Sequence, residues 1–473
     1  MGEPARARLG VLSVLSLGAL FGCGSDERSS APEPVKQPNI VLIFVDDLGY
    51  ADLGIHGSEE ILTPNIDQLA REGARLTQGY VSAPQCSPAR AGILTGRSQS
   101  RFGFEMNVPP GYSVSAQELL DGKPLPGMPV SERTIAQRLK AAGYATGAIG
   151  KWHLGEEEEF HPMSRGFDEF YGFLRGGSRY LPSRRTPAVE RDGVKEVCRE
   201  YLTDAFSHEA ASFIERHNEE PFFLYLAYNC PHTPMEAKPD ELKRFSAIKD
   251  ETRRTLAAMM SSMDQGVGEV MDALSSSGID DETLVFFISD NGGQTNKNGS
   301  LNDPFSGKKG DLLEGGIRVP FFARWPGVIK AGATLEHPVT ALDFAPTALA
   351  LAGADEASGM DGVDLSGYLS GQTKELAERV LYWRFGEQRA LRRGPWKYYG
   401  YMGEIELLFN LDEDPREERN VARDHPSVFD ELRGLHAAWE AELVEPLWDV
   451  PMNTSVRAKA LKQRYRLGTA GPR

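Results

Sequence analysis

Polar side chains suited to chemistry follow four runs of apolar residues, each of which reads as a buried strand. They are Asp46 and Asp47, Lys151 and His153, His232, and Asp290 and Asn291. Ligands bind at the carboxyl edge of the strands in open parallel sheets, so we expect these side chains to meet there. Carboxylate and amide oxygens favour Ca²⁺ or Mg²⁺ over zinc, and histidine transfers protons near neutral pH. Taken singly, the two aspartates and the SDNGG segment also fit turns or a helix cap.

A further candidate is Cys86 in the pentapeptide CSPAR, which ends at Arg90. An unmodified thiol attacks sulfur poorly, and free cysteine is most often a small, buried apolar residue. Arg90 lies four residues downstream, on what we expect to be the first turn of a helix, so that it can reach back to Cys86. A pattern this short is not diagnostic alone, and its neighbours in the chain must decide.

Five other motifs accompany the pentapeptide in a fixed order. VLIFVDD precedes it, and GKWHLG, PHTP, SDNGG and GKKGDLLEGGIRVP follow it. Together they resemble the formylglycine-dependent sulfatases of the alkaline phosphatase superfamily, over a stretch from about Asn39 to the segments RALRRGPWKYY and LFNLDEDPREERNVA. The resemblance implies that a separate sulfatase-maturing enzyme oxidises Cys86 to Cα-formylglycine. The aldehyde hydrate is then the nucleophile, and a covalent sulfoenzyme is the intermediate.

The same resemblance assigns roles around the nucleophile. Arg90 holds the aldehyde hydrate, Lys151 bridges the sulfate and the formylglycine oxygen, and His153 removes the proton from the remaining hydroxyl. His232 and Lys309 contact the sulfate and assist the leaving oxygen.

Two further assignments follow from the family pattern. Its catalytic lysine stands directly before a glycine, here Gly310, which selects Lys309 over the competing Lys308. The implied metal is Ca²⁺, with Mg²⁺ as the alternative. Its ligands are Asp46, Asp47, Asp290, Asn291 and the converted Cys86.

The elements that must position these residues indicate an α/β fold. Asn39–Val45, Pro221–Tyr228 and Thr283–Ser289 are continuous apolar runs, typical of strands buried on both faces of a parallel sheet. Between the last two, apolar residues recur every three or four positions from Leu256 to Leu274, which predicts a helix with one buried side. We expect a large, mixed, mostly parallel sheet sandwiched by helices, as in alkaline phosphatase.

Other elements are expected between and after these. Thr63 and Pro64 should begin a helix that runs to Glu72, and another helix should run from near Ser131 to Gly143, before a strand over Tyr144–Ile149. After about Gly353, four short strand-like runs precede a helix with one apolar side, which predicts a small antiparallel sheet with one packed helix.

The amino terminus predicts export. Arg6 and Arg8 precede the apolar run VLSVLSLGALFG, which is too short to span a bilayer and ends at Cys23. The sequence resembles a lipoprotein signal whose cysteine is lipidated, and plain signal cleavage is the alternative because Phe21 is unusually large there. We predict a periplasmic or cell-surface lipoprotein of a bacterium.

These observations divide the chain into five parts. We predict a signal peptide over residues 1–23, a tether over 24–38, a catalytic domain over 39–353, a smaller α+β subdomain over 354–455 and a basic, solvated tail over 456–473. The net charge of −16 argues against a nucleic-acid partner and requires a local cationic pocket for an anionic substrate. Cys198 and Cys230 could form a disulfide or remain free thiols.

The sequence therefore predicts an exported sulfatase that acts on a sulfated carbohydrate, with aryl sulfates as surrogate substrates. The segment Gly166–Tyr180 resembles bacterial polysaccharide sulfatases and offers Arg175, Arg179 and Tyr180 as sugar contacts, although a surface loop explains it equally well. Two alternatives stay open. One is a phosphomonoester or phosphodiester hydrolase on the same fold, and the other is a catalytically silent glycan-binding lipoprotein with unconverted Cys86.

Overall fold

The computed structural model describes residues 37–108, 122, 125–182, 189–354, 357–448 and 454–467, together with Met1. The predicted lipoprotein signal, Cys23 and the predicted tether up to residue 36 lie outside the described residues, apart from Met1. Among the helices that are described, none combines the length and the apolar composition needed to cross a membrane.

A ten-stranded sheet forms the centre of the fold, in the order β11-β2-β10-β9-β1-β8-β4-β5-β6-β7. Its strands are β1 (Asn39–Val45), β2 (Ala74–Leu76), β4 (Ala145–Lys151), β5 (Glu169–Phe173), β6 (Val189–Arg191), β7 (Val194–Glu196), β8 (Phe222–Ala227), β9 (Thr283–Ser289), β10 (Phe321–Arg324) and β11 (Ala333–Leu335). The five strands from β9 to β5 are parallel, whereas β10, β6 and β7 pair antiparallel with their neighbours. The prediction of a mixed, mostly parallel sheet is confirmed.

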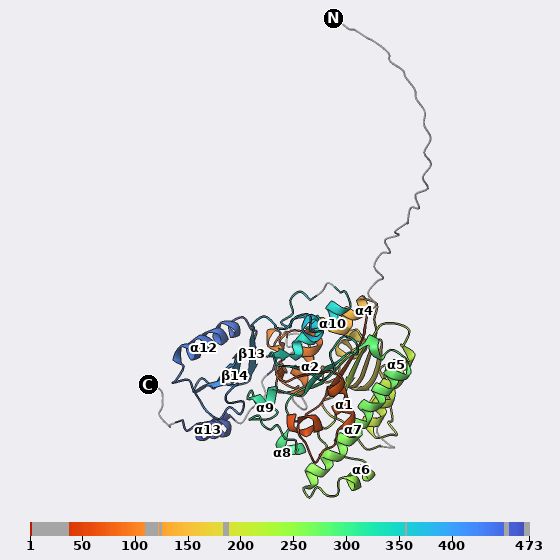
Figure 1. The fold of residues 1–473 in the computed structure, drawn as a ribbon, viewed down its shortest axis with the longest axis horizontal. Helices are drawn as coiled ribbons and strands as arrows, with labels where there is room; N and C mark the ends of the chain where they lie inside the picture. The colour runs from red at the N-terminus through yellow and green to blue at the C-terminus, as the bar shows by residue number, and fades with distance from the viewer. Residues whose placement is uncertain are drawn as a thin grey trace, which may run out of the picture. The chain divides into compact units, whose positions relative to one another are not determined.

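Helices cover both faces of this sheet because alternate residues of its central strands point to opposite sides. Val41, Ile43 and Val45 of β1 pack in one core with α1 (Pro64–Glu72), α5 (Leu202–Arg216) and α7 (Glu251–Ser276). Ile40, Leu42 and Phe44 pack in the other with α2 (Cys86–Thr95), α4 (Ile135–Ala141) and α10 (Phe344–Leu351). Figure 1 shows the two helical layers on either side of the sheet.

Short elements complete this part of the chain. They are the parallel pair β3 (Gly79–Tyr80) and β12 (Val339–Thr340), and the helices α6 (Pro239–Arg244), α8 (Thr295–Asn298), α9 (Glu314–Ile317) and α11 (Ser366–Leu369). The predicted start of α4 near Ser131 is wrong by four residues. Thr134 is the N-cap instead, because its side chain accepts from the backbone of Gln137 while the Gln137 side chain accepts from the backbone of Thr134.

A second, four-stranded antiparallel sheet follows in the order β13-β14-β15-β16. Its strands are β13 (Val380–Phe385), β14 (Gln388–Arg393), β15 (Trp396–Tyr401) and β16 (Ile405–Asn410), and α12 (Pro426–Glu440) covers one face. Side chains of the other face, including Trp383, Tyr399 and Leu407, belong to the same core as the large sheet. Residues from Gln37 onward therefore form one compact unit.

The predicted solvated tail is instead partly a packed helix, α13 (Thr454–Arg464). Leu461 is buried, and Arg457 forms an ion pair of 2.6 Å with Asp311. The hydroxyl of Tyr465 donates to the carbonyl of Glu417 at 2.9 Å. The basic composition of this segment concealed an apolar side that packs on the four-stranded sheet, and residues after 467 are not described.

Candidate active site

Four neighbouring strands deliver their polar residues to one edge of the large sheet. The strands are β9, β1, β8 and β4, which lie side by side and parallel. Asp46 and Asp47 follow β1, Asp290 and Asn291 follow β9, Lys151 ends β4, and His232 lies beyond β8. The structure thus brings together, at the carboxyl edge, the residues that the strand pattern placed there.

Cys86 is the first residue of α2 and points into this cluster. Its side chain is buried, with Sγ 3.3 Å from Oδ1 of Asp46 and 2.9 Å from the ammonium of Lys309. Burial, together with the negative charge of Asp46, raises the pKa of the thiol to about 12. The unmodified side chain is therefore a protonated thiol rather than a reactive thiolate.

The acidic residues form a cluster of oxygen atoms that could bind a metal ion. One ligand atom from each of Asp46, Asp47, Asp290 and Cys86 lies within 4.8 Å of the others. Oδ2 of Asp47 and Oδ1 of Asn291 are buried and accept no hydrogen bond within the described part of the chain. Burial and the neighbouring Asp46 raise the pKa of Asp290 to about 7. Unsatisfied buried oxygens beside crowded carboxylates fit a hard divalent cation such as Ca²⁺ or Mg²⁺.

Three buried cations surround the same carboxylates. Lys151 Nζ lies 2.7 Å from Oδ2 of Asp46, and Lys309 Nζ lies 2.5 Å from Oδ1 of Asp47. Arg90 Nη2 lies 3.0 Å from Oδ2 of Asp290. Each ion pair is shielded from solvent, so its charges act at short range with little screening.

Arg90 differs in two respects from its predicted position. It lies on the second turn of α2 rather than the first, because the helix begins at Cys86 itself. Its hydrogen bonds to described residues go to Asp290, the hydroxyl of Tyr225 and the carbonyl of Lys151, and none goes to Cys86. In this structure Arg90 therefore orients a carboxylate.

His153 reaches the cluster by a route that the sequence did not predict. Its φ is 62°, in the left-handed region, so the backbone after Lys151 is not extended. Its Nδ1 is buried and forms no hydrogen bond to any described residue. Burial, reinforced by the charges of Lys151 and Arg90, lowers the pKa of His153 well below 6.5. The ring is therefore neutral near pH 7 and able to accept a proton.

His232 presents its other nitrogen to the cluster. Nδ1 lies 2.6 Å from the carbonyl of Thr233, to which it must donate, and Nε2 lies 3.8 Å from Oδ2 of Asp47. Burial lowers the pKa of His232, and Lys151 contributes to the shift. In the neutral ring, Nε2 therefore faces the site without a proton and can accept one.

The loop that carries Lys309 is held by Gln388, a residue that no sequence motif predicted. Gln388, fully buried on β14, accepts from the backbone of Leu312 at 2.9 Å and donates to the carbonyl of Gly310 at 2.8 Å. Arg457 donates to the same carbonyl at 3.1 Å. No local motif marks either residue, since both lie far along the chain from Lys309.

Tyr180 is not the sugar contact that the sequence suggested. It is buried, and its hydroxyl donates to the carbonyls of Asn229 and His232, so it fixes the segment that carries His232. Arg175 and Arg179 remain exposed, and each forms an ion pair with a glutamate.

The two other cysteines of the described chain are free. Cys198 and Cys230 are both buried and unpaired, so the structure supports free thiols rather than a disulfide.

Comparisons with known proteins agree with this geometry. A family model described as Sulfatase matches residues 38–354, and one described as N-sulphoglucosamine sulphohydrolase, C-terminal, matches residues 308–438. N-acetylgalactosamine-6-sulfatase of Rattus norvegicus is 34% identical over 414 residues, which cover 83% of this chain and 75% of that protein. Arylsulfatase A of Homo sapiens is 33% identical over 463 residues, which cover 85% and 87%.

Two solved structures extend the comparison. Ps i-CgsB in complex with k-i-k-neocarrahexaose has a TM-score of 0.81 and 35% identity, and the match covers 90% of this chain and 97% of that one. The phosphonate monoester hydrolase of Agrobacterium radiobacter has a TM-score of 0.62 at 19% identity, over 86% and 95% of the two chains, which indicates a shared fold alone.

Proposed function

The chain belongs to the sulfatase family and is a sulfuric ester hydrolase, and we propose that it removes sulfate from a sulfated carbohydrate through a formylglycine made from Cys86. Two relatives support the carbohydrate substrate. One is named for a sulfated amino sugar, and the other was solved in complex with an oligosaccharide.

The observation that carries the proposal is the position of Cys86. It lies at the start of α2, with Lys309 on one side of Sγ and Asp46 on the other. A formylglycine hydrate at this position has two hydroxyls on one carbon. One oxygen attacks the sulfate ester and gives its proton to Nε2 of His232, which passes it to the departing alcohol oxygen. The bond from sulfur to that oxygen breaks, and a covalent sulfoenzyme forms. Loss of the proton from the second hydroxyl breaks the C–O bond, which releases sulfate and restores the aldehyde.

The residues of the chain divide these two steps between them. His153, neutral because its pKa is low, accepts the proton of the second hydroxyl. Lys151 and Lys309 place positive charge where the sulfate oxygens must lie. His232 and Lys309 serve the departing alcohol oxygen, and Arg90 holds Asp290 in place.

The cluster of carboxylate and amide oxygens would hold the divalent cation. Asp46, Asp47, Asp290 and Asn291, with the converted Cys86, supply its ligands, and we propose Ca²⁺, with Mg²⁺ as the alternative. A cation bound there supplies Lewis-acid stabilisation of the sulfate oxygens.

We also propose the cellular context from the sequence. An export signal over residues 1–23 and lipidation of Cys23 would place the enzyme in the periplasm or on the cell surface of a bacterium. A sulfatase-maturing enzyme is then a required partner, because the chain has to receive its aldehyde from another protein.

Mass analysis of the tryptic peptide that ends at Arg90, combined with turnover of nitrophenyl sulfate and nitrophenyl phosphate, tests the proposal. We expect Cys86 to have exchanged sulfur for an aldehyde oxygen, and sulfate ester hydrolysis to dominate. Full turnover by protein with unconverted Cys86 would contradict the mechanism. Preference for the phosphate ester would favour the phosphoesterase alternative, and an unconverted Cys86 together with no turnover would favour the glycan-binding lipoprotein.

A further inference from the structure

A cavity of about 640 Å³ lies beside the loop that carries Lys309. The loop 307–313 forms one wall, and α13 forms another. Its charged lining residues are Lys308, Arg457 and Arg464 on the positive side and Asp311 on the negative side. We call this cavity the cationic pocket.

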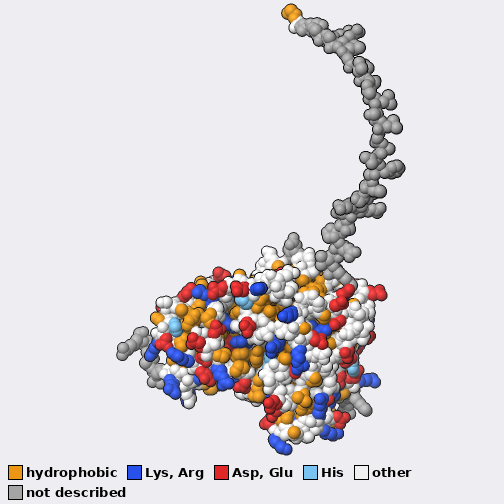
Figure 2. All heavy atoms as spheres, in the orientation of Figure 1, with side chains coloured by type: hydrophobic (Ala, Val, Ile, Leu, Met, Phe, Trp, Pro, Cys, Tyr) orange, Lys and Arg blue, Asp and Glu red, His pale blue; other side chains and the backbone are white. Residues whose placement is uncertain are grey.

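The positive charges of the cationic pocket are incompletely neutralised. Asp311 is paired with Arg457 at 2.6 Å. Arg464 bonds only neutral oxygens among the described residues, those of Ser306 and the Arg416 carbonyl, and the Lys308 ammonium has no ion-pair partner there. In Figure 2, basic and acidic side chains are interspersed over the face shown, in a chain whose net charge is −16. A local excess of cations in this acidic protein therefore points to an anionic ligand.

The cationic pocket is joined to the active site by one loop. Lys308 precedes Lys309, whose ammonium is 2.9 Å from Cys86 Sγ, and consecutive Cα atoms lie about 3.8 Å apart. The next residue, Gly310, donates to the carbonyl of Pro84 at 2.8 Å and accepts from Arg457 at 3.1 Å. The same loop therefore contacts the active site through Lys309 and lines the cationic pocket through Lys308.

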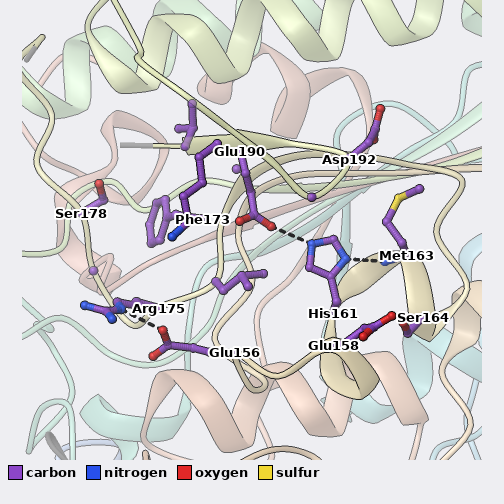
Figure 3. Close-up of a pocket in the computed structure, with 16 residues that line it drawn as sticks. Glu156, Glu158, His161, Met163, Ser164, Phe173, Arg175, Ser178, Glu190 and Asp192 are labelled. Atoms are coloured by element: carbon purple, nitrogen blue, oxygen red, sulfur yellow. Dashed lines mark hydrogen bonds and ion pairs between the residues drawn. The ribbon is translucent and has the colours of Figure 1, made fainter. Parts of the chain in front are cut away.

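A second cavity has the opposite charge among its described lining residues (Figure 3). It measures about 930 Å³ and includes Gly177, whose position lies against His232. Its carboxylates are Glu156, Glu158, Glu190 and Asp192, against the cations Arg175 and Lys195. The figure shows His161 bonded to Glu190, and Arg175 paired with Glu156. Among the described residues that line this cavity, carboxylates outnumber cations, so they disfavour an anionic substituent, whereas those of the cationic pocket favour one.

We propose that the cationic pocket binds a second anionic group of the substrate, a sulfate or a carboxylate on the sugar next to the one that is desulfated. This inference rests on the proposed function. The family pattern selects Lys309 rather than Lys308 as the catalytic lysine. The inference gives Lys308 a different role, as a residue that determines substrate specificity.

The test compares three disaccharides that share one sulfate ester and differ in the adjoining sugar, which is neutral, carboxylated or sulfated. Lys308→Gln and Arg464→Gln should lower kcat/KM for the two charged disaccharides about three- to tenfold more than for the neutral one, mainly through KM. Lys459→Gln is the matched control, because Lys459 is exposed on α13 and does not line the pocket. Thermal unfolding verifies that each variant is folded.

Equal losses on all three disaccharides, or none, would overturn the inference. A loss confined to the sulfated or to the carboxylated disaccharide would identify the anion. Calorimetric binding of the same disaccharides to the Cys86→Ala protein separates this inference from the proposed function, since it needs no turnover. If no substrate is hydrolysed but the Lys308→Gln change still weakens binding of the charged disaccharides, the anion-binding role of the pocket is supported and the proposed catalytic mechanism is refuted.

Discussion

Lys309 Nζ lies 2.9 Å from Sγ of Cys86, although the two residues are 223 positions apart in the chain. The contact exists because α2 begins at the carboxyl edge of the large sheet, where the loop 307–313 returns after β9. Gln388 on β14 holds that loop through the backbone of Gly310 and Leu312. The four-stranded sheet is therefore part of the active-site scaffold.

Cys86→Ser and Cys86→Ala should both abolish steady-state sulfatase turnover while leaving the fold intact. Serine has one hydroxyl, so it can be sulfated once but cannot expel sulfate by C–O cleavage. Turnover of nitrophenyl sulfate and mass analysis of the peptide at residue 86 check this, with thermal unfolding as the control. Wild-type rates from Cys86→Ser would show that the hydrate is not used.

Removal of divalent metal should abolish activity, and Ca²⁺ should restore it better than Zn²⁺ because the ligand atoms are oxygens. Asp290→Ala and Asn291→Ala should each weaken Ca²⁺ binding about tenfold or more, measured by calorimetry as well as by recovered activity. Asp240→Ala, an exposed change on α6, should bind Ca²⁺ as the wild type does. Full activity of the chelated, dialysed protein would exclude the metal from the mechanism.

The strands of the site were predictable because buried parallel strands are nearly continuous apolar runs. Asn39–Val45 and Thr283–Ser289 are strands with the predicted bounds, and the polar residues after them occupy the expected edge. The rest depended on tertiary contacts. No sequence motif near Lys309 indicates that Gln388 contacts its loop. The left-handed backbone of His153 is held by a hydrogen bond from its N–H to the carbonyl of Leu174, just after β5. The apolar side of α13 could not be recognised from the sequence, because the sheet that it covers is formed by distant residues.

Lys397→Met should destabilise the protein by about 3–5 kcal/mol, because it leaves the buried carboxylate of Glu417 without a cation and leaves Glu314 with Arg318 alone. Lys397 Nζ lies 2.9 Å from Glu314 and 2.7 Å from Glu417, and all three side chains are fully buried. Urea unfolding measures the loss. Lys462→Met, which breaks an exposed pair with Glu404, should change stability by less than about 0.5 kcal/mol.

The loss in Lys397→Met should depend on pH. Burial and the neighbouring Glu314 already raise the pKa of Glu417 from 4.5 to about 7, against the opposing charge of Lys397, and removing the cation raises it further. A carboxyl whose folded pKa is raised costs no stability below its unfolded pKa and destabilises as pH rises through the folded value. The difference from the wild type should therefore be largest above pH 7 and smallest near pH 4.5. A loss independent of pH would contradict the buried-charge explanation.

The two active-site histidines should stall different halves of turnover. If His153 deprotonates the sulfated hydrate, His153→Ala should release alcohol in a single burst and accumulate a sulfated peptide at residue 86. If His232 and Lys309 serve the departing oxygen, His232→Ala and Lys309→Ala should slow the burst itself. That loss should be severe for an alkyl sulfate and slight for a nitrophenyl sulfate, because an activated phenol carries its own negative charge and needs little help.

Rapid-quench kinetics with both esters resolves the two steps. His208→Ala is the matched control, since His208 is half-exposed on α5 and pairs with Glu200 far from the cluster, and its burst should equal that of the wild type. An undiminished burst with the alkyl sulfate in both His232→Ala and Lys309→Ala would refute the leaving-group assignment. Absence of a sulfated peptide in His153→Ala would refute the other half, because neutral His153 would then not be the base that its burial and low pKa allow.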